Sequence, residues 1–393
     1  SGDGGAVVAR VGDNMLLATT TMSKNVREGL DFFPLSVDFE EKMYAAGRIP
    51  GGFFKREGRP TQEAILTSRL TDRPLRPLFP DGMRNEVQVI ITALSSDSIH
   101  HLDVLAVNSA SAALTICDIS WDGPIGAVRI AYIGGELVVS PTIPEMAEST
   151  LDLRIAGSRD AIIMVEAGAD EVSEALMIEA LAVGHEAIQS IITLQEEMRE
   201  AVGKPKREIT FAEHDLELEA AVQARLGDRI PQLVATHTGR DERNAAMDVL
   251  REEIVQGFLA EDDAADPKAI REVIAKELKK AIRSRILYDG IRPDGRDYTT
   301  IRELSSEVGL SPRAHGSGLF RRGQTQVLSL VALGTPREAQ RLEGLGPEES
   351  RRYMHHYNFP PFSTGETWFL RGPKRREIGH GALAERALLP MIP

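Results

Sequence analysis

Val11-Gly12-Asp13-Asn14-Met15-Leu16-Leu17 resembles Arg322-Gly323-Gln324-Thr325-Gln326-Val327-Leu328, which lies 311 positions further along the chain. Two more pairs occur in the same order: residues 37–39 with 357–359, at an offset of 320, and residues 73–80 with 386–393, at an offset of 313. Three ordered pairs whose offsets differ by nine or less predict a duplicated fold. We call the two copies the first repeat and the second repeat.

The first 205 residues alternate short strand-like runs with helical segments, which predicts a mixed α/β unit. Residues 6–10 and 15–21 are expected to pair around a turn at Gly12. The other expected strands are residues 87–94, 128–133, 151–155 and 161–166, and the expected helices are residues 64–70, 104–116 and 171–200. The first of these helices should begin near Thr61 and stop at Arg73-Pro74.

Residues 209–287 have a different pattern, because apolar side chains recur there at helical spacing. The clearest series is Ile270, Val273, Ile274, Leu278, Ile282 and Ile286. We therefore expect an all-helical insert that ends at a Gly290 cap, followed by a turn at residues 292–296 into new α/β material. The predicted domains are 1–205, the first repeat; 206–288, the helical domain; and 289–393, the incomplete front part of the second repeat.

Composition predicts folded domains in a reducing compartment. The chain has 393 residues, of which 42% are hydrophobic and 27% charged, and this is an ordinary globular mixture. Cys117 is the only cysteine, so an intrachain disulfide is excluded. No run approaches the roughly 18 consecutive apolar residues of a membrane helix, and the first residues lack a signal-peptide pattern. The expected location is the cytoplasm, without membrane partners.

Positive charge is concentrated in two short stretches of an otherwise acidic chain, whose formal net charge is -13. Residues 48–76 hold seven basic and three acidic side chains, and residues 371–386 hold five basic and two acidic ones. Residues 211–280 hold sixteen acidic and ten basic side chains. Because a polyanion responds to local charge, these two basic stretches are the candidate nucleic-acid contacts.

The first basic stretch contains Phe53-Phe54-Lys55-Arg56-Glu57-Gly58-Arg59-Pro60 after the glycine-flanked residues 47–52. Aromatic rings that stack on bases, beside cations that bind phosphates, are what single-stranded RNA requires. The alternative is that the two phenylalanines are core residues and the cations a solvated surface. The residues we predict to contact RNA here are Phe53, Phe54, Lys55, Arg56 and Arg59, and Arg296 is added from the second repeat.

The second basic stretch contains Lys374-Arg375-Arg376-Glu377-Ile378-Gly379-His380-Gly381. Guanidinium groups bind phosphate oxygens in pairs of hydrogen bonds, and a helix start adds N–H donors. Helical spacing would put Arg376 and His380 on one face. The alternative is a cluster that only forms ion pairs with Glu377 and Glu385. His355-His356 do not predict a metal site, because adjacent strand residues point to opposite faces and no further ligands lie at the required spacing.

These motifs resemble the bacterial polynucleotide phosphorylases (polyribonucleotide nucleotidyltransferases). The matching segments are residues 31–35, 44–51, 53–60, 72–79, 85–89, 123–126, 355–361 and 374–381. The resemblance implies two RNase PH-like units of ribosomal-protein-type α/β fold, separated by a helical domain, in a ring-shaped homotrimer that threads RNA through a channel.

The resemblance also implies an activity and its residues. It implies processive 3′-to-5′ phosphorolysis of single-stranded RNA by inorganic phosphate, releasing nucleoside diphosphates reversibly, in mRNA turnover. Arg375, Arg376 and His380 would then be catalytic, and the first repeat would bind RNA without catalysing. Mg²⁺ would be the cofactor, with ligands beyond residue 393, and components of an RNA degradosome are candidate partners.

Because the expected metal-binding half lies beyond Pro393, we expect this 393-residue chain to be inactive or nearly so. Two alternatives stay open. One is an RNase PH-type exoribonuclease that trims tRNA, and the other is an RNA-binding scaffold without catalysis. The length of the RNA products separates the first alternative from phosphorolysis of long RNA, and dependence on phosphate separates the second.

Overall fold

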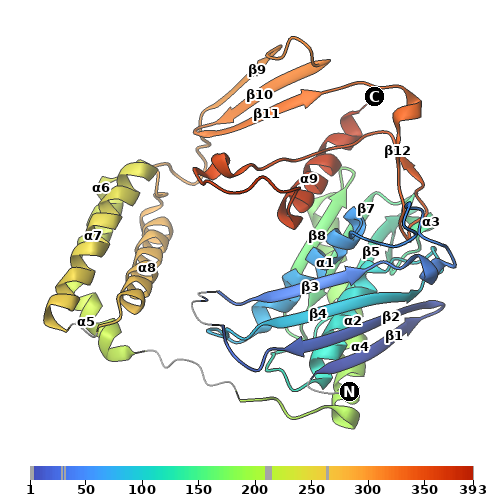
Figure 1. Ribbon diagram of the computed structural model, residues 1–393, viewed down its shortest axis with the longest axis horizontal. Helices are drawn as coiled ribbons and strands as arrows, with labels where there is room; N and C mark the ends of the chain where they lie inside the picture. The colour runs from blue at the N-terminus through green and yellow to red at the C-terminus, as the bar shows by residue number, and fades with distance from the viewer. Residues whose placement is uncertain (1–3, 28–29, 31, 209–214, 263–264, 393) are drawn as a thin grey trace. The chain divides into compact units, whose positions relative to one another are not determined.

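The computed structural model describes residues 4–27, 30, 32–208, 215–262 and 265–392 (Figure 1). It divides into a larger unit, residues 1–211 with 335–393, and a smaller unit, residues 212–334, and each is described by itself. Leu345 and Ala382 of the second repeat are buried in the larger unit. The domain boundaries predicted at residues 206 and 289 stay a prediction.

The larger unit contains a mixed sheet in the order β1-β2-β4-β3. Its strands are β1 (Gly5–Val11), β2 (Asn14–Met22), β4 (Val87–Ser95) and β3 (Leu35–Glu40). β3 runs parallel to β4, and the other pairs are antiparallel. Burial alternates along β2, β3 and β4, so one face is a hydrophobic core, on which α1 (Gln62–Leu75) and α2 (Asp103–Ile116) pack. These elements confirm the strands and helices expected in the first 116 residues.

A second, antiparallel sheet follows in the order β6-β5-β7-β8. Its strands are β6 (Glu136–Val139), β5 (Gly126–Ile133), β7 (Leu151–Gly157) and β8 (Ile162–Ala169), and the short helix α3 (Ile143–Met146) lies between β6 and β7. Helix α4 (Glu174–Val202) packs on β5 and β7. It is long and apolar enough to cross a membrane by length and composition alone, but its buried stripe, from Ala180 to Gln195, faces this sheet and α2.

Buried hydrogen bonds fix α2 and α4 against the start of β5. Ser111 donates to Gln195 Oε1 at 2.6 Å, and Gln195 Nε2 donates to the Ile125 carbonyl at 2.8 Å. The Ile125 N–H donates back to Ser111 Oγ at 3.0 Å. Because each of these buried polar groups has a hydrogen-bond partner, their burial does not destabilise the fold. The network therefore specifies one register between the helices and the strand.

Helix α1 begins as expected and ends later than expected. Thr61 caps it by accepting a hydrogen bond from the Ala64 N–H at 3.0 Å. The expected stop at Arg73-Pro74 is wrong, because the helix continues to Leu75 and then into the 3-10 turn η2 (Arg76–Leu78). Pro74 lies in the last turn, where its missing N–H removes only one helical hydrogen bond.

The smaller unit begins with the predicted helices. They are α5 (Leu216–Leu226), α6 (Arg229–Thr236), α7 (Arg240–Glu261) and α8 (Pro267–Ser284), and they share one apolar core. A π-helical turn, η3 (Arg285–Asp289), then ends at Gly290 with a left-handed φ of 70°, which confirms the predicted cap. Residues 209–214, where the helical pattern was expected to start, lie outside the described residues. An antiparallel sheet of β9 (Leu304–Val308), β10 (Gly316–Arg322) and β11 (Thr325–Val331) completes the unit.

The two repeats share local geometry near the start and near the end of their predicted alignment. The β1-β2 hairpin pairs Val11 with Asn14 around Gly12 at φ 60°, and the β10-β11 hairpin pairs Arg322 with Thr325 around Gly323 at φ 59°. Helix α1 and turn η2 recur 313 residues later as helix α9 (Arg375–Leu388) and turn η6 (Leu389–Met391). These matches confirm the duplication.

Between these ends the repeats match only in part. The 3-10 turn η1 (Met43–Ala46) ends at left-handed Gly47, and η5 (Pro361–Thr364) ends at left-handed Gly365. Residues 357–359 belong to no strand, whereas residues 37–39 lie in β3. The remaining elements of the second repeat are η4 (Pro336–Glu338) and the short pair β12 (Gln340–Arg341) and β13 (Ser350–Arg351).

The duplicated helices α1 and α9 pack on one another in the larger unit. Arg73 of α1 and Arg386 of α9 occupy the same position, 313 residues apart, and both bind Glu166 of β8, at 2.6 and 2.9 Å. Arg154 of β7 contacts the same carboxylate at 3.3 Å. Glu166 is therefore a shared anchor for equivalent residues of the two repeats.

Candidate nucleic-acid interface

The loop between η1 and α1 presents its two aromatic rings to solvent. Phe53 is 93% exposed and Phe54 is 87% exposed, so the alternative that they are core residues is wrong. Their ring centroids lie 5.4 Å apart with an interplanar angle of 82°, an edge-to-face pair. Such exposure of large rings leaves their faces open for stacking.

Backbone contacts hold the base of this loop. The Lys55 N–H donates to the Gly52 carbonyl at 2.9 Å, with Lys55 at a left-handed φ of 52°. The Glu57 carboxylate accepts from the Met43 N–H at 2.9 Å, and this backbone hydrogen bond lowers the pKa of Glu57. The loop is thus tied to η1, while Phe53 and Phe54 project from it.

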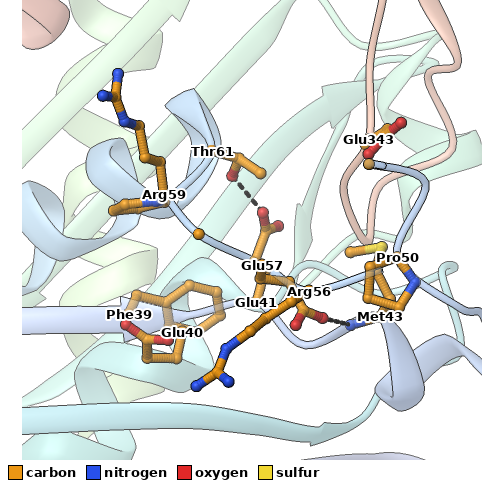
Figure 2. A pocket seen from close by; sticks show the side chains of 13 residues that line it. Phe39, Glu40, Glu41, Met43, Pro50, Arg56, Glu57, Arg59, Thr61 and Glu343 are labelled. Atoms are coloured by element: carbon orange, nitrogen blue, oxygen red, sulfur yellow. Dashed lines mark hydrogen bonds between the residues drawn. The ribbon is translucent and has the colours of Figure 1, made fainter. Parts of the chain in front are cut away.

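A pocket of about 230 Å³ lies under the loop (Figure 2). Its carboxylates are Glu40, Glu41, Glu57 and Glu343, and its cations are Arg56 and Arg59, whose side chains extend in different directions. Burial raises the pKa of Glu41 in spite of a hydrogen bond from Thr61. With more carboxylates than cations, this pocket does not suit a phosphate group, so we expect RNA contacts outside it, at exposed side chains of the loop that include Arg56 and Arg59.

The start of α9 separates its two arginines. Arg375 donates to the Val37 carbonyl of β3 at 2.7 Å and forms an ion pair with Asp38. Arg376 instead lies over the Phe359 ring, 5.6 Å from its centroid, and has no ion pair among the described residues. The two arginines thus have different partners, because Arg375 is engaged by the first repeat, and the catalytic assignment of Arg375, Arg376 and His380 stays a prediction.

Arg376 and His380 lie against one aromatic segment. Tyr357 and Phe359 have parallel rings, 6.4 Å apart at 13°, and the His380 ring lies 5.3 Å from Tyr357. Arg376 and His380 were predicted to lie on one face of the helix, and their contacts with the neighbouring rings of Phe359 and Tyr357 agree with this. Their side chains can approach one anion from this segment, since both offer N–H donors.

Neither glutamate near the cluster neutralises Arg376. Glu377 accepts from the N–H groups of Lys374 at 2.7 Å and Phe359 at 2.8 Å, and these backbone hydrogen bonds lower its pKa. Glu385 pairs with Arg351 at 3.1 Å. The alternative of a cluster that only binds Glu377 and Glu385 is therefore not what the structure shows. Part of the helix start is nevertheless already capped by Glu377.

Sequence profiles of known families match most of the chain. The profile "3′ exoribonuclease family, domain 1" matches residues 1–120 and 300–393, and domain 2 of the same family matches residues 123–187. The profile "Polyribonucleotide nucleotidyltransferase, RNA binding domain" matches residues 217–297. The chain belongs to the 3′ exoribonuclease family. Because one profile matches both ends of the chain, it also confirms the duplication.

Relatives of this exoribonuclease family chain are named polyribonucleotide nucleotidyltransferase. Those of Roseiflexus sp. (strain RS-1) and Heliobacterium modesticaldum are 53% and 52% identical, over 99% of this chain and 52% and 55% of their own lengths. The relative from Thermomicrobium roseum is 51% identical over 99% of this chain and 50% of its own length. The chain thus spans about half the length of these relatives.

One solved structure gives only a weak likeness. Rice (Oryza sativa) Rrp46 matches with a TM-score of 0.40 and 14% sequence identity, over 49% of this chain and 92% of that chain. This likeness carries no argument here.

The two repeats of this exoribonuclease family chain differ at the positions of the predicted catalytic residues. At an offset of 313, Arg375, Arg376 and His380 of α9 correspond to Gln62, Glu63 and Thr67 of α1. The first repeat thus has an acid where the second has Arg376. Its helix lacks the cations that would bind phosphate oxygens at this position.

Arg296 lies in the smaller unit and is already engaged. Its guanidinium donates to Asp294 Oδ2 at 2.8 Å and to the Thr300 carbonyl at 2.7 Å. Arg292 donates to the Asp297 carbonyl at 2.8 Å in the same turn. The assignment of Arg296 to RNA contact stays a prediction, and its visible role is to hold residues 292–300.

The residues that the structure describes do not form a site for Mg²⁺. Across the described ranges, no group of three or more His, Cys, Asp or Glu side chains is arranged to hold a metal ion. His355 contacts the Tyr353 hydroxyl through Nδ1 at 2.9 Å.

Sequence reasoning missed the partners that orient the α9 cations. The sequence pattern placed Asp38, Tyr357 and Phe359 in a predicted repeat, and Tyr357 and Phe359 also in a family motif, but it did not indicate these contacts. Asp38 lies more than 300 residues before α9 in the sequence, so its contact with Arg375 depends on tertiary packing that local patterns do not reveal. The repeat alignment could have pointed to residues 37–39 and 357–359 as neighbours of the helix.

Proposed function

We propose that this chain is part of a 3′-to-5′ phosphorolytic exoribonuclease that degrades single-stranded RNA with inorganic phosphate. Phosphate attacks the phosphorus of the terminal phosphodiester, and the bond to the 3′ oxygen of the preceding nucleotide breaks. That oxygen takes up a proton, so the products are a nucleoside diphosphate and an RNA shortened by one nucleotide. The reverse reaction polymerises RNA.

The observation that carries the proposal is the exposed face of α9 on which Arg376 and His380 lie beside Tyr357 and Phe359. Protein groups contribute to phosphoryl transfer mainly by positioning and by offsetting charge. Arg376, free of carboxylates among the described residues, binds oxygens of the phosphate groups. His380 donates a hydrogen bond to the same group, and Arg375 positions the helix start against Asp38.

The Phe53 loop supplies the contact with the strand. Phe53 and Phe54 stack on bases, while Lys55, Arg56 and Arg59 bind the sugar-phosphate backbone. Base stacking is tolerant of sequence because every base has a ring face, which suits an enzyme that degrades RNA of any sequence. The profile match of residues 217–297 to an RNA binding domain supports the same substrate.

Several finer assignments belong to this proposal. They are a homotrimer around an RNA channel, action in mRNA turnover in the cytoplasm, contact with degradosome components, and RNA contact by Arg296. A divalent cation such as Mg²⁺ would offset the charge of the phosphate groups when bound, with ligands outside the residues described here. The names of the relatives support the substrate and the reaction class.

The experiment is an RNA degradation assay on the protein at its full native length, with and without inorganic phosphate. We expect shortening of single-stranded RNA and release of nucleoside diphosphates only when phosphate is present. RNA binding without shortening under either condition would contradict the proposal and favour the scaffold. Trimming limited to tRNA ends would favour the other alternative. The 393-residue chain, assayed in parallel, tests the expectation that it is inactive.

A further inference from the structure

A second group of exposed aromatic side chains precedes α9. Trp368 is 67% exposed, Phe369 is 74% exposed and Leu370 is 83% exposed. The Trp368 and Phe369 rings lie 6.4 Å apart with an interplanar angle of 74°, an edge-to-face pair. Three consecutive large apolar side chains in solvent are costly unless a partner covers them, so this segment indicates an interaction surface.

One cation contacts this aromatic pair, and three more follow it in the sequence. The Arg371 guanidinium lies over the Phe369 ring, 5.7 Å from its centroid, and the Arg371 N–H donates to the Phe369 carbonyl at 3.0 Å. Residues 371–376 hold four cations, Arg371, Lys374, Arg375 and Arg376, and no acid. A partner for this surface must therefore offer flat apolar faces together with negative charge.

The position of the segment in the repeat identifies its counterpart. Phe53-Phe54-Lys55-Arg56 and Trp368-Phe369-Leu370-Arg371 are related by an offset of 315, within the range of 311 to 320 that relates the repeats. Each tetrapeptide lies between a 3-10 turn that ends at a left-handed glycine and the duplicated helix, α1 or α9. Both present an exposed edge-to-face aromatic pair followed by an arginine.

We propose that Trp368 and Phe369 form a second base-stacking platform for single-stranded RNA, next to the Arg376 face of α9. Bases stack on the two rings, and Arg371 and Lys374 bind the adjoining phosphates. The platform deepens the proposed function and rests on it, because it names residues that hold the strand beside the site of phosphorolysis. A protein surface would not require four cations within residues 371–376 without an acid, so RNA fits the segment better.

Tryptophan fluorescence gives a direct test, because the chain has only two tryptophans. Trp121 is 6% exposed and donates its Nε1–H to the Leu75 carbonyl at 3.1 Å, so added ligand reaches Trp368 alone. Titration of the 393-residue chain with a short oligouridylate should quench the Trp368 emission, and Trp368→Phe should abolish the change. Unchanged emission while fluorescence anisotropy of a labelled oligouridylate shows binding would overturn the platform.

Affinity of the same oligonucleotide measures the contribution of each ring. Trp368→Ala and Phe369→Ala should each weaken binding by about 5- to 100-fold, as the loss of one stacked base predicts. Trp368→Phe should restore most of the affinity, because a ring face remains. Ile178→Ala is the matched control, since Ile178 is 68% exposed on α4, far in sequence from either aromatic pair.

The outcomes separate this platform from a protein interface and from the proposed function. Alanine variants that change the oligomeric state but not the affinity would overturn the platform in favour of a contact between protein surfaces. Phosphorolysis by the full-length protein with unchanged affinity of the alanine variants would overturn the platform alone. Quenching of Trp368 by RNA, together with no phosphorolysis by the full-length protein, would overturn the proposed function alone. A full-length protein that neither binds the oligonucleotide nor degrades RNA would overturn both.

Discussion

At the scale of single residues, the structure gives the two adjacent arginines of α9 different tasks. Arg375 is held by Asp38 and the Val37 carbonyl, whereas Arg376 lies over Phe359 without an ion pair among the described residues. A guanidinium that has no protein carboxylate remains available to phosphate oxygens. Arg376 is therefore the residue of this pair that we expect to contact substrate.

Arg376→Ala should lower the rate of phosphorolysis by about 100-fold, the usual effect of removing one group that stabilises the transition state. Its urea unfolding midpoint should stay close to that of the parent protein. Arg375→Ala should reduce both the rate of phosphorolysis and the urea unfolding midpoint, because Asp38 loses its partner. An equal loss of stability in both variants would show that Arg376, like Arg375, has a structural role.

Arg296 is the residue for which structural and RNA-binding roles compete. Its side-chain hydrogen bond lowers the pKa of Asp294 to about 2, below the ordinary 3.8. A lowered carboxyl pKa stabilises the fold above pH 3.8, and this contribution is lost as the pH falls through about 2. Arg296→Ala should therefore reduce the free energy of unfolding by about 1 kcal/mol at neutral pH, and by less as the pH falls below about 4.

Denaturant melts between pH 7 and 2 measure this difference, and oligonucleotide affinity is measured on the same variant. Reduced affinity with unchanged stability would support an RNA contact by Arg296. Reduced stability with unchanged affinity would assign it to the turn of residues 292–300.

At the scale of elements, helix α4 packs directly against β5 at Gly126, because a residue without a side chain lets the strand and the helix approach closely. A Cβ on Gly126 would lie 2.8 Å from Ile188 Cβ and 2.9 Å from the Ile188 carbonyl oxygen. Gly126→Ala should lower the free energy of unfolding by about 1–3 kcal/mol, because the helix backbone must move. Gly168→Ala on β8 is the control, since nothing lies within 4 Å of its added Cβ. Similar urea midpoints for both variants would contradict this packing.

Helices α1 and α9 are joined through Glu166, which binds Arg73 and Arg386 from equivalent positions of the repeats. Burial raises the pKa of Glu166, but the hydrogen bond from Arg386 and the charges of Arg154 and Arg386 outweigh it, so the pKa is lowered. Its stabilising effect is therefore present above the ordinary value of 4.5 and is lost as the pH falls through the lowered pKa.

Glu166→Gln should lower the free energy of unfolding by about 1–3 kcal/mol at pH 7, and the difference should vanish in acid. The control is Glu196→Gln, which removes the partner of Arg159 at an exposed site and should cost less than about 1 kcal/mol. Calorimetric melting of both variants at pH 7 and pH 3 measures the effect. An equal loss for both variants at pH 7 would show that Glu166 does not anchor the helices.

At the scale of the whole molecule, the sequence predicted the mixed α/β repeats and the helical insert because their signals are local. Alternating burial in β2 and β4, the Thr61 cap and the Gly290 cap each depend on a few neighbouring residues. The duplication was also visible, because helix α9 repeats α1 at a constant offset. The predicted end of α1 is wrong, because a proline in the last turn removes only one backbone hydrogen bond, which does not stop the helix.

The candidate site was predicted less completely than the fold. The motif left burial of Phe53 and Phe54 in the core as an open alternative, and the structure shows that they are exposed. The ion pair that distinguishes Arg375 from Arg376 involves Asp38, which is 337 residues away from Arg375 in sequence. The engagement of Arg296 by Asp294 and Thr300 depends on the geometry of one turn. Side-chain partners of this kind are set by tertiary packing, so composition and spacing could not reveal them.

The central claim is that this chain contributes to phosphorolysis of RNA, and the fate of labelled phosphate tests it most directly. The protein at its full native length is incubated with single-stranded RNA and radiolabelled inorganic phosphate, and the released nucleotides are separated. We predict nucleoside diphosphates that carry the label in the β-phosphate, because the attacking phosphate becomes that group. Unlabelled nucleoside monophosphates would show that water attacks instead, and would contradict the account.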